Sequence, residues 1–246
     1  MRFTSHADYA SRSLEEILGD FLHEFEHLEI DTLETVLLLN LPDGIKKVAL
    51  NPTAQWAPCF GPTVADFNND GHEDVFLSQN LDTGNHKWGR MDAGHGLLLL
   101  GDGEGNLNAI PSTASGIRLK NEQRGTASAD FNQDGKMDLA VLERGKGAHL
   151  FVNQTEHTGV TVSLKGSSAN PHCIGARLQK INLQTGNVYG PSKEIQSGSG
   201  YRSLNSLKHV FAHPGKAFQI QVTWPNGKIS RHSIPSGITT VTLQQP

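Results

Sequence analysis

The stretch "DFNNDGHED", residues 66–74, places three Asp, one Asn and one Gly within nine positions. A second stretch, "DFNQDGKMD" at residues 130–138, repeats the pattern. Carboxylates this close together repel one another, so two copies with the same spacing need a common cause. The odd positions of both copies carry side-chain oxygens: Asp66, Asn68, Asp70 and Asp74 in the first, and Asp130, Asn132, Asp134 and Asp138 in the second.

A bound calcium ion would offset this repulsion. Besides the odd-position side chains, the seventh residue of each copy, His72 or Lys136, would offer its backbone carbonyl. Gly71 and Gly135 allow the sharp turn that folds such a loop around an ion. Hard oxygen donors in this number suit calcium, whereas magnesium keeps more water. A solvated Asp-rich turn would explain one copy but is a poor explanation of two, so the sequence predicts two Ca²⁺ sites.

The loops are not EF-hands. That motif requires a bidentate Glu at position 12 and flanking helices. Position 12 is Leu77 in the first copy and Val141 in the second, and the flanking residues are typical of strands. The loops are therefore predicted to join β-strands.

The rest of the chain favours an all-β fold. From Thr35 onward, short apolar runs alternate with Gly, Pro, Asn and Asp, which predicts hairpins at short spacing. "AFQIQVTW" at 217–224 alternates as a half-buried strand does, and the following Asn226-Gly227 favours a tight turn with positive φ. The acidic, Gly-rich "GDGEGN" at 101–106 lacks the final Asp of the calcium pattern, so we expect an ordinary hairpin turn there.

The N-terminus carries the one strong helix signal. Apolar residues recur with the helical period over residues 14–28, and Ser13 with Glu16 forms a predicted capping box. Within it, His23 to His27 match H-E-x-x-H, the zinc-protease pattern, but both His lie opposite the apolar stripe and no third ligand stands out. A solvated helix face is the preferred interpretation.

Two resemblances follow from these motifs. "FGPTVADFNNDGHEDVFLSQN" and "GTASADFNQDGKMDLAVLERG" resemble the FG-GAP/VCBS repeats of integrin-α-like β-propellers, in which such loops bind calcium between two strands of a blade. "NPHCIGARL", "SGSGYRSLNS" and "VTWPNGK" resemble the ASPIC/UnbV domain of cartilage-acidic-protein-like chains. The resemblances imply a partial β-propeller over residues 1–157, including the helix, and a small β-sandwich-like ASPIC/UnbV domain over 158–246.

Bulk properties exclude several functions. The 246 residues have a net charge of −4 without a basic cluster, so nucleic acid is not an expected partner. No apolar run approaches the length of a membrane span, and no signal peptide is visible. Cys59 and Cys173 are far apart in sequence, and no disulfide is expected between them.

The resulting functional expectation is a calcium-binding, non-catalytic module that mediates adhesion by binding a protein or glycan. By family resemblance its location would be extracellular, cell-surface or periplasmic. The alternative is an accessory propeller region of a larger hydrolase or lyase. Two to three blades cannot close a propeller of typically four to eight, so we also expect further blades or self-association.

Overall fold

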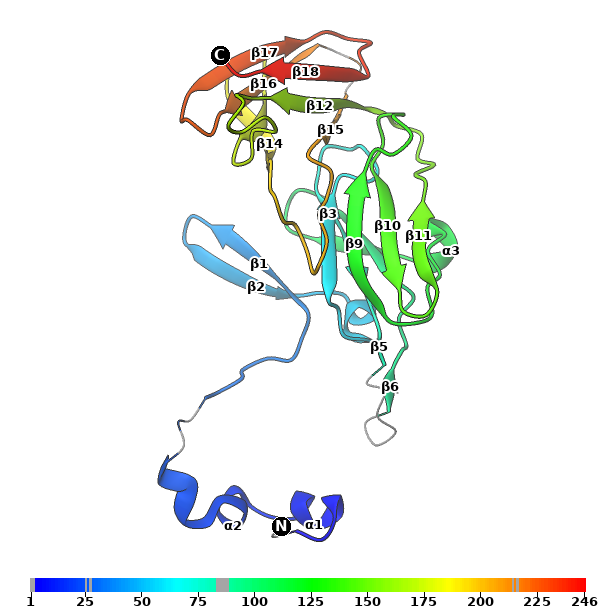
Figure 1. The fold of residues 1–246 in the computed structure, drawn as a ribbon, viewed down its shortest axis with the longest axis vertical. Coiled ribbons are helices and arrows are strands. Elements are labelled where there is room, and N and C mark those ends of the chain that lie inside the picture. Colours follow the sequence, from blue (N-terminus) through cyan, green and yellow to red (C-terminus); the bar gives the residue numbers. More distant parts are fainter. Residues whose placement is uncertain (1–2, 25, 27, 83–88, 214, 216) are drawn as a thin grey trace. The chain divides into compact units, whose positions relative to one another are not determined.

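The computed structural model describes residues 3–24, 26, 28–82, 89–213, 215 and 217–246. The chain forms two compact units, Met1–Glu34 and Thr35–Pro246. Strands predominate, and helices are few and short (Figure 1). The expectation of an all-β fold is therefore confirmed at the level of fold class.

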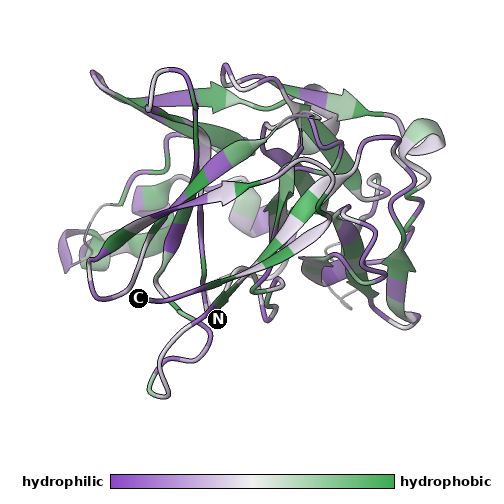
Figure 2. Ribbon diagram, turned by 90° about the horizontal axis from the view of Figure 1, so that it is seen from above, coloured by the Kyte–Doolittle hydropathy of each residue, from purple (hydrophilic) through white to green (hydrophobic). Residues whose placement is uncertain are grey.

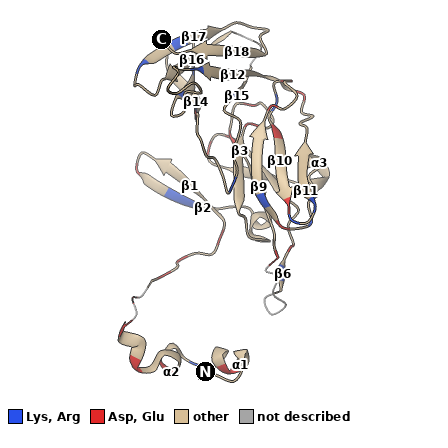
Figure 3. Cartoon of the chain, viewed as in Figure 1, with Lys and Arg blue, Asp and Glu red and all other residues tan. Residues whose placement is uncertain are grey.

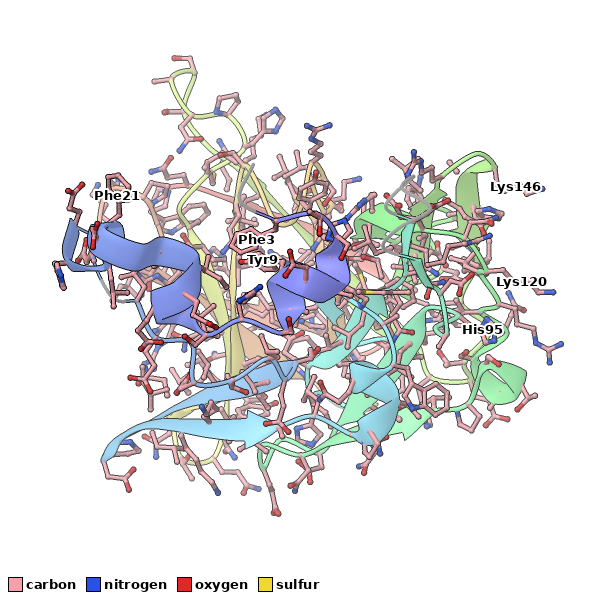
Figure 4. The ribbon with its side chains drawn as sticks, turned by 90° about the horizontal axis from the view of Figure 1, so that it is seen from below. Phe3, Tyr9, Phe21, His95, Lys120 and Lys146 are labelled. Carbon is pink, nitrogen blue, oxygen red and sulfur yellow. The ribbon has the colours of Figure 1, made fainter. Side chains whose placement is uncertain are left out.

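The N-terminal unit contains α1 (His6–Ala10), α2 (Leu14–Leu18) and the 3-10 helix η1 (Gly19–Glu24). The predicted capping box is present: Glu16 N donates to Ser13 Oγ over 3.3 Å, and Ser13 N donates to Glu16 Oε2 over 2.9 Å. Figure 4 shows Phe3 and Tyr9 beside each other, with their ring centroids 5.4 Å apart and the rings nearly perpendicular. Acidic residues recur along these helices (Figure 3).

The prediction of one helix over 14–28 is wrong in extent. The α-helix ends at Leu18 because Gly19 takes φ 57° and ψ −131°, which no α-helix continues. A Gly within a helix costs about 1 kcal/mol relative to Ala. No residue of α2 is buried, so packing does not offset that cost.

The first acidic stretch lies in a four-stranded antiparallel sheet of order β3-β4-β7-β8. It joins β3 to β4, and "GDGEGN" forms the expected hairpin turn between β7 and β8. Strand β3 alternates buried and exposed residues along its length. The strands are β3 (Gly61–Ala65), β4 (Asp74–Ser78), β7 (Leu97–Gly101) and β8 (Leu107–Ile110).

The second acidic stretch joins β9 (Gln123–Ala129) to β10 (Asp138–Glu143) in a three-stranded sheet completed by β11 (Gly147–Phe151). Strands β3 and β9 lie side by side: the hydroxyls of Thr63 and Thr126 are hydrogen-bonded, and Thr126 Oγ1 donates to Gly61 O over 3.0 Å. One apolar core, with Phe76 and Val141 at its centre, joins the two sheets. The acidic loops therefore occupy equivalent places in adjacent sheets.

Shorter elements surround these sheets. The predicted hairpin near residue 40 is β1 (Val36–Leu41) with β2 (Gly44–Ala49). The other small elements are the 3-10 helix η2 (Pro52–Gln55), the hairpin strands β5 (Leu81–Asp82) and β6 (Arg90–Met91), and α3 (Ser112–Ser115). The sheets of the described residues do not close into a ring.

The C-terminal part is a β-sandwich. One sheet has the order β15-β12-β18, with β12 and β18 parallel, and the other has the order β14-β13-β16-β17. Apolar side chains from both sheets form a single core that includes Val162, Ile220 and Trp224. The strands are β12 (Gly159–Lys165), β13 (Arg177–Ile181), β14 (Val188–Glu194), β15 (His209–Ala212), β16 (Phe218–Thr223), β17 (Ile229–Ile234) and β18 (Thr240–Gln244).

The expected half-buried strand is confirmed in β16. Phe218, Ile220 and Val222 are buried, and the residues between them are half-exposed. In the turn that follows, Gly227 takes φ 81°. Figure 2 shows the same mixture of hydrophobic and hydrophilic residues along the strands. The sandwich and the two acidic-loop sheets belong to one compact unit, so the domain boundary near residue 157 stays a prediction.

The structure also bears on the two cysteines and on membrane-spanning helices. Cys59 and Cys173 are both free. None of the helices in the described part of the chain is long and apolar enough to cross a membrane.

Candidate metal-binding loops

The first residue of each acidic loop holds the turn together. In the first loop, Asp66 Oδ1 accepts the N–H of Asp70 over 3.1 Å and Oδ2 accepts that of Gly71 over 2.9 Å. Asp70 Oδ1 in turn accepts the N–H of His72 over 2.8 Å, and Asn68 Oδ1 accepts the Asp70 N–H over 3.0 Å. The side-chain oxygens at positions one, three and five therefore all face the inside of the same turn.

The ninth residue of the first loop, Asp74, anchors the loop to the sheet. Asp74 is fully buried, and its two oxygens accept the N–H groups of Phe67 (2.8 Å) and Gly101 (2.9 Å). The second of these bonds ties the loop to the neighbouring strand β7. Asp74 thus anchors the loop on the sheet.

The second loop repeats this arrangement bond for bond. Asp130 accepts from the N–H groups of Asp134 (3.0 Å) and Gly135 (3.1 Å). Asp138 accepts from Phe131 (2.9 Å) and Asn153 (2.8 Å), the latter just beyond β11. The remaining bonds, from Asp134 N to Asn132 Oδ1 and from Lys136 N to Asp134 Oδ1, match as well. One sequence pattern therefore produces one local structure twice.

Left-handed backbone conformations shape both turns. The sixth positions, Gly71 and Gly135, have φ values of 96° and 79°. The fourth positions, Asn69 and Gln133, also have positive φ, at 56° and 61°. Asn tolerates this region better than most residues do, and Gly adopts it without a steric penalty. This explains why the pattern requires Gly at position six.

Burial raises the pKa of two carboxyl groups in the first loop. It raises the pKa of Asp74 to about 6, and the nearby charges of Asp66 and Asp70 add to the rise. Burial also raises the pKa of Asp66. Both shifts mean that a negative charge is costly there, and a bound cation would remove that cost.

The donor set suits a hard cation. Each carboxylate has about four lone-pair positions, so the backbone N–H bonds leave acceptor capacity free. The carbonyls of His72 and Lys136 accept no hydrogen bond from other described residues. Among the described residues, no group of three or more His, Cys, Asp or Glu side chains is arranged so that it could hold a metal ion. The ten predicted residues are nevertheless brought into two turns whose donor chemistry suits calcium.

Residues from the C-terminal sandwich contact the second loop. Thr161 Oγ1 donates to Asp130 Oδ2 over 2.6 Å, and Gly159 N donates to Gly135 O over 2.7 Å. The first loop reaches the same place, because Asn69 Nδ2 donates to Gly135 O and to His157 O. The start of β12 therefore touches both loops.

Two lysines from the sandwich approach the first loop. Lys193 Nζ lies 2.8 Å from Glu73 Oε1, and buried Lys180 donates to Ala212 O over 2.7 Å beside Gly71. Burial lowers the pKa of Lys180, and the Asp66 charge opposes that shift. Neither lysine nor Thr161 could be identified from sequence, because the approach depends on contacts between segments far apart in the chain.

The H-E-x-x-H match, which we interpret from the sequence as a solvated helix face, lies partly outside the described residues. His23 and Glu24 lie in η1, but His27 lies outside the described residues.

The chain is similar to cartilage acidic protein 1 from three vertebrates. Identity is 27% over 178 residues for the Homo sapiens protein, 28% over 183 for Mus musculus and 27% over 178 for Xenopus tropicalis. Each alignment takes in 70% of this chain and 26% of the relative, so the chain spans about a quarter of the relatives' length. No family model matches the chain.

Proposed function

We propose that this chain is a calcium-stabilised, non-catalytic binding module. One observation carries the proposal: two nonapeptides far apart in sequence fold into turns with the same hydrogen bonds and the same oxygen donors. Asp66, Asn68, Asp70, Asp74 and the carbonyl of His72 would hold one Ca²⁺. The equivalent set of Asp130, Asn132, Asp134, Asp138 and the Lys136 carbonyl would hold the second.

The ion would supply positive charge and so stabilise the loops. Extracellular modules of this kind bind calcium with Kd of about 10⁻⁴ to 10⁻³ M. A ligand that binds only the folded state adds about 2.7 kcal/mol at a hundredfold excess over Kd. Calcium would then fix the turns that touch β12.

We further propose that the β3-β4-β7-β8 and β9-β10-β11 sheets are FG-GAP/VCBS-type propeller blades. In support, each acidic loop joins the first two strands of its sheet, and the first strands β3 and β9 are adjacent. The sandwich from β12 to β18 is proposed to be an ASPIC/UnbV-like domain. The similarity to cartilage acidic protein 1 supports the ASPIC/UnbV-like assignment.

We also propose a location outside the cytoplasm, extracellular, cell-surface or periplasmic, as the family resemblance implies. Sites of about 10⁻⁴ to 10⁻³ M fill only where calcium is abundant. The proposed partner is a protein or glycan, with adhesion as the outcome. A measured Kd far tighter than micromolar would argue against this location.

Calorimetric titration with calcium tests the central claim. We expect two sites in the native chain and one in each of the variants Asp70→Asn and Asp134→Asn. Asp102→Asn is the matched control, because Asp102 organises an acidic Gly-rich turn that lacks the ninth-position Asp. EDTA should lower the melting temperature of the native chain. Absence of calcium binding at several millimolar would refute the proposal.

A further inference from the structure

A cavity of about 440 Å³ lies at the end of β4 opposite the first acidic loop. Its lining includes Trp56, Gln79, His95, Leu97 and Ser112. The loop precedes β4 and Gln79 follows it, so the five-residue strand separates them by about 17 Å. Ligand pockets in proteins have volumes of about 300 to 1,000 Å³, so this cavity is large enough to hold a small molecule.

Gln79 lies at the cavity, is 2% exposed and is held in place by hydrogen bonds. Its Nε2 donates to Thr53 O over 3.2 Å and its backbone N–H donates to Gln123 Oε1 over 3.0 Å. Its Oε1 accepts no hydrogen bond from other described residues. Gln79 lines the cavity, and this oxygen is not one of the buried atoms that lack a partner. It is accessible and keeps free acceptor capacity, so it is available to a donor on a ligand.

One wall passes very close to Gln79. A Cβ at Gly94 would lie 2.5 Å from Gln79 Oε1, so only Gly fits there. Asn80 fixes this wall, since its Oδ1 accepts the Gly94 N–H (2.9 Å) and its Nδ2 donates to Gly94 O (2.8 Å). The cavity is therefore formed before any ligand arrives.

Trp56 supplies an aromatic surface at the cavity. It directly follows η2 and is 58% exposed, although Ala54 and Ala57 beside it are buried. Its indole offers a flat apolar face together with an N–H donor. Leu97 and Ile110 continue the apolar side of the cavity.

Among the described residues, the lining of the cavity contains no Asp, Glu, Lys or Arg. Asn51 Nδ2, the His95 ring and the Ser112 hydroxyl have no hydrogen-bond partner among the described residues. His95, labelled in Figure 4, is exposed. Donors and acceptors without charge, beside one aromatic face, match a ligand that is rich in hydroxyls and uncharged.

We propose that this cavity binds a neutral sugar residue, whose C–H face stacks on Trp56 while its hydroxyls bond to Gln79 Oε1, His95 and Ser112. The sugar would be the glycan ligand of the proposed binding module, so the inference rests on that function but requires no calcium. A peptide would instead pair with backbone groups at the edge strand β8, and would leave the amide of Gln79 unused.

Saturation-transfer NMR on the full chain tests the proposal with glucose, galactose, mannose and N-acetylglucosamine as probes. At least one should bind in the millimolar range. Trp56→Ala should weaken that binding at least tenfold, and His95→Ala and Ser112→Ala should each weaken it severalfold. Trp56 and His95 are exposed, so both variants should keep the native melting temperature. Tyr189→Ala removes an aromatic side chain that is 40% exposed in β14 and should change nothing.

Three outcomes would overturn the proposal: no neutral sugar binds, binding survives Trp56→Ala unchanged, or glucuronate or a short peptide binds this site more tightly than the neutral sugars. A parallel series in EDTA separates the two claims. Sugar binding that persists in EDTA supports the cavity whatever the outcome of calcium titration. Calcium binding without any sugar binding refutes only the cavity.

Discussion

Gly135 shows how much a single residue contributes to these loops. It has φ 79°, and a Cβ there would lie 2.6 Å from the backbone oxygen of Gly159. Gly145 has φ 78° with open space around it, so Gly145→Ala isolates the cost of the backbone conformation. We expect about 1 to 2 kcal/mol for Gly145→Ala and a distinctly larger loss for Gly135→Ala. Urea denaturation measures the loss of stability in both variants. Equal losses would show that the contact between a side chain at position 135 and the Gly159 oxygen adds no cost.

The lowered pKa of His209 predicts a loss of folding stability in acid. Burial lowers its pKa to about 4, and the positive charge of Lys193 contributes; a hydrogen bond to Glu194 O and the charge of Glu73 act in the opposite direction. As pH falls through 6.5, the unfolded chain takes up the proton first. Stability is therefore fully present above pH 6.5 and is lost down to about pH 4, by at most about 1.4 kcal/mol per pH unit.

The corresponding measurement is denaturant unfolding between pH 7 and pH 4 in EDTA. His209→Gln should flatten the pH dependence relative to the native chain. His172→Gln changes an exposed histidine and should leave it unaltered. If the free energy of unfolding changes with pH in the same way in the native chain and in His209→Gln, then His209 has the same pKa in the folded and unfolded states.

At the scale of elements, the segment "SGSGYRSLNS", residues 197–206, fastens the sandwich to strand β9. Asn205 Oδ1 accepts the Ser128 N–H over 3.0 Å, and Ser206 N donates to Ser128 O over 2.8 Å. Ser128 is 1% exposed, so Asn205→Ala would leave a buried N–H without a partner. This costs about 1 to 3 kcal/mol.

Two measurements check this prediction. Asn205→Ala should lower the urea midpoint and speed hydrogen exchange at the Ser128 amide. Asn187→Ala, in the exposed turn between β13 and β14, should do neither. Unchanged exchange at Ser128 in Asn205→Ala would mean that the segment does not fasten the strand.

Elements with a strong local cause were predictable from the sequence. The hairpin turns, the alternation in Phe218–Thr223 and the capping box at Ser13 all depend on neighbours in the chain. The helix beyond Leu18 failed because its apolar stripe finds no buried surface to pack on. The contacts of Thr161 and Asn205, and the cavity beside Trp56, depend on segments far apart in sequence, so no local pattern encodes them. The turns of the two acidic loops were predictable, and the contacts around them were not.

At the scale of the whole molecule, strand β11 presents an unpaired edge. Among the described residues it pairs only with β10, whereas the neighbouring sheet has four strands. Leu150 and Val152 at this edge are 55% and 43% exposed. Edges with free N–H and C=O groups and apolar side chains template pairing with other chains.

We therefore expect the 246-residue chain to self-associate, and light scattering over a range of protein concentrations measures this. The mass should rise with concentration, and Leu150→Lys should shift it toward the monomer because a charge blocks edge pairing. Leu183→Lys replaces a leucine that is 53% exposed in a turn, and it should leave the mass unchanged. A native chain that stays monomeric at every concentration would show that the β11 edge is protected, since an open edge with exposed leucine and valine should not remain unpaired when other copies are abundant.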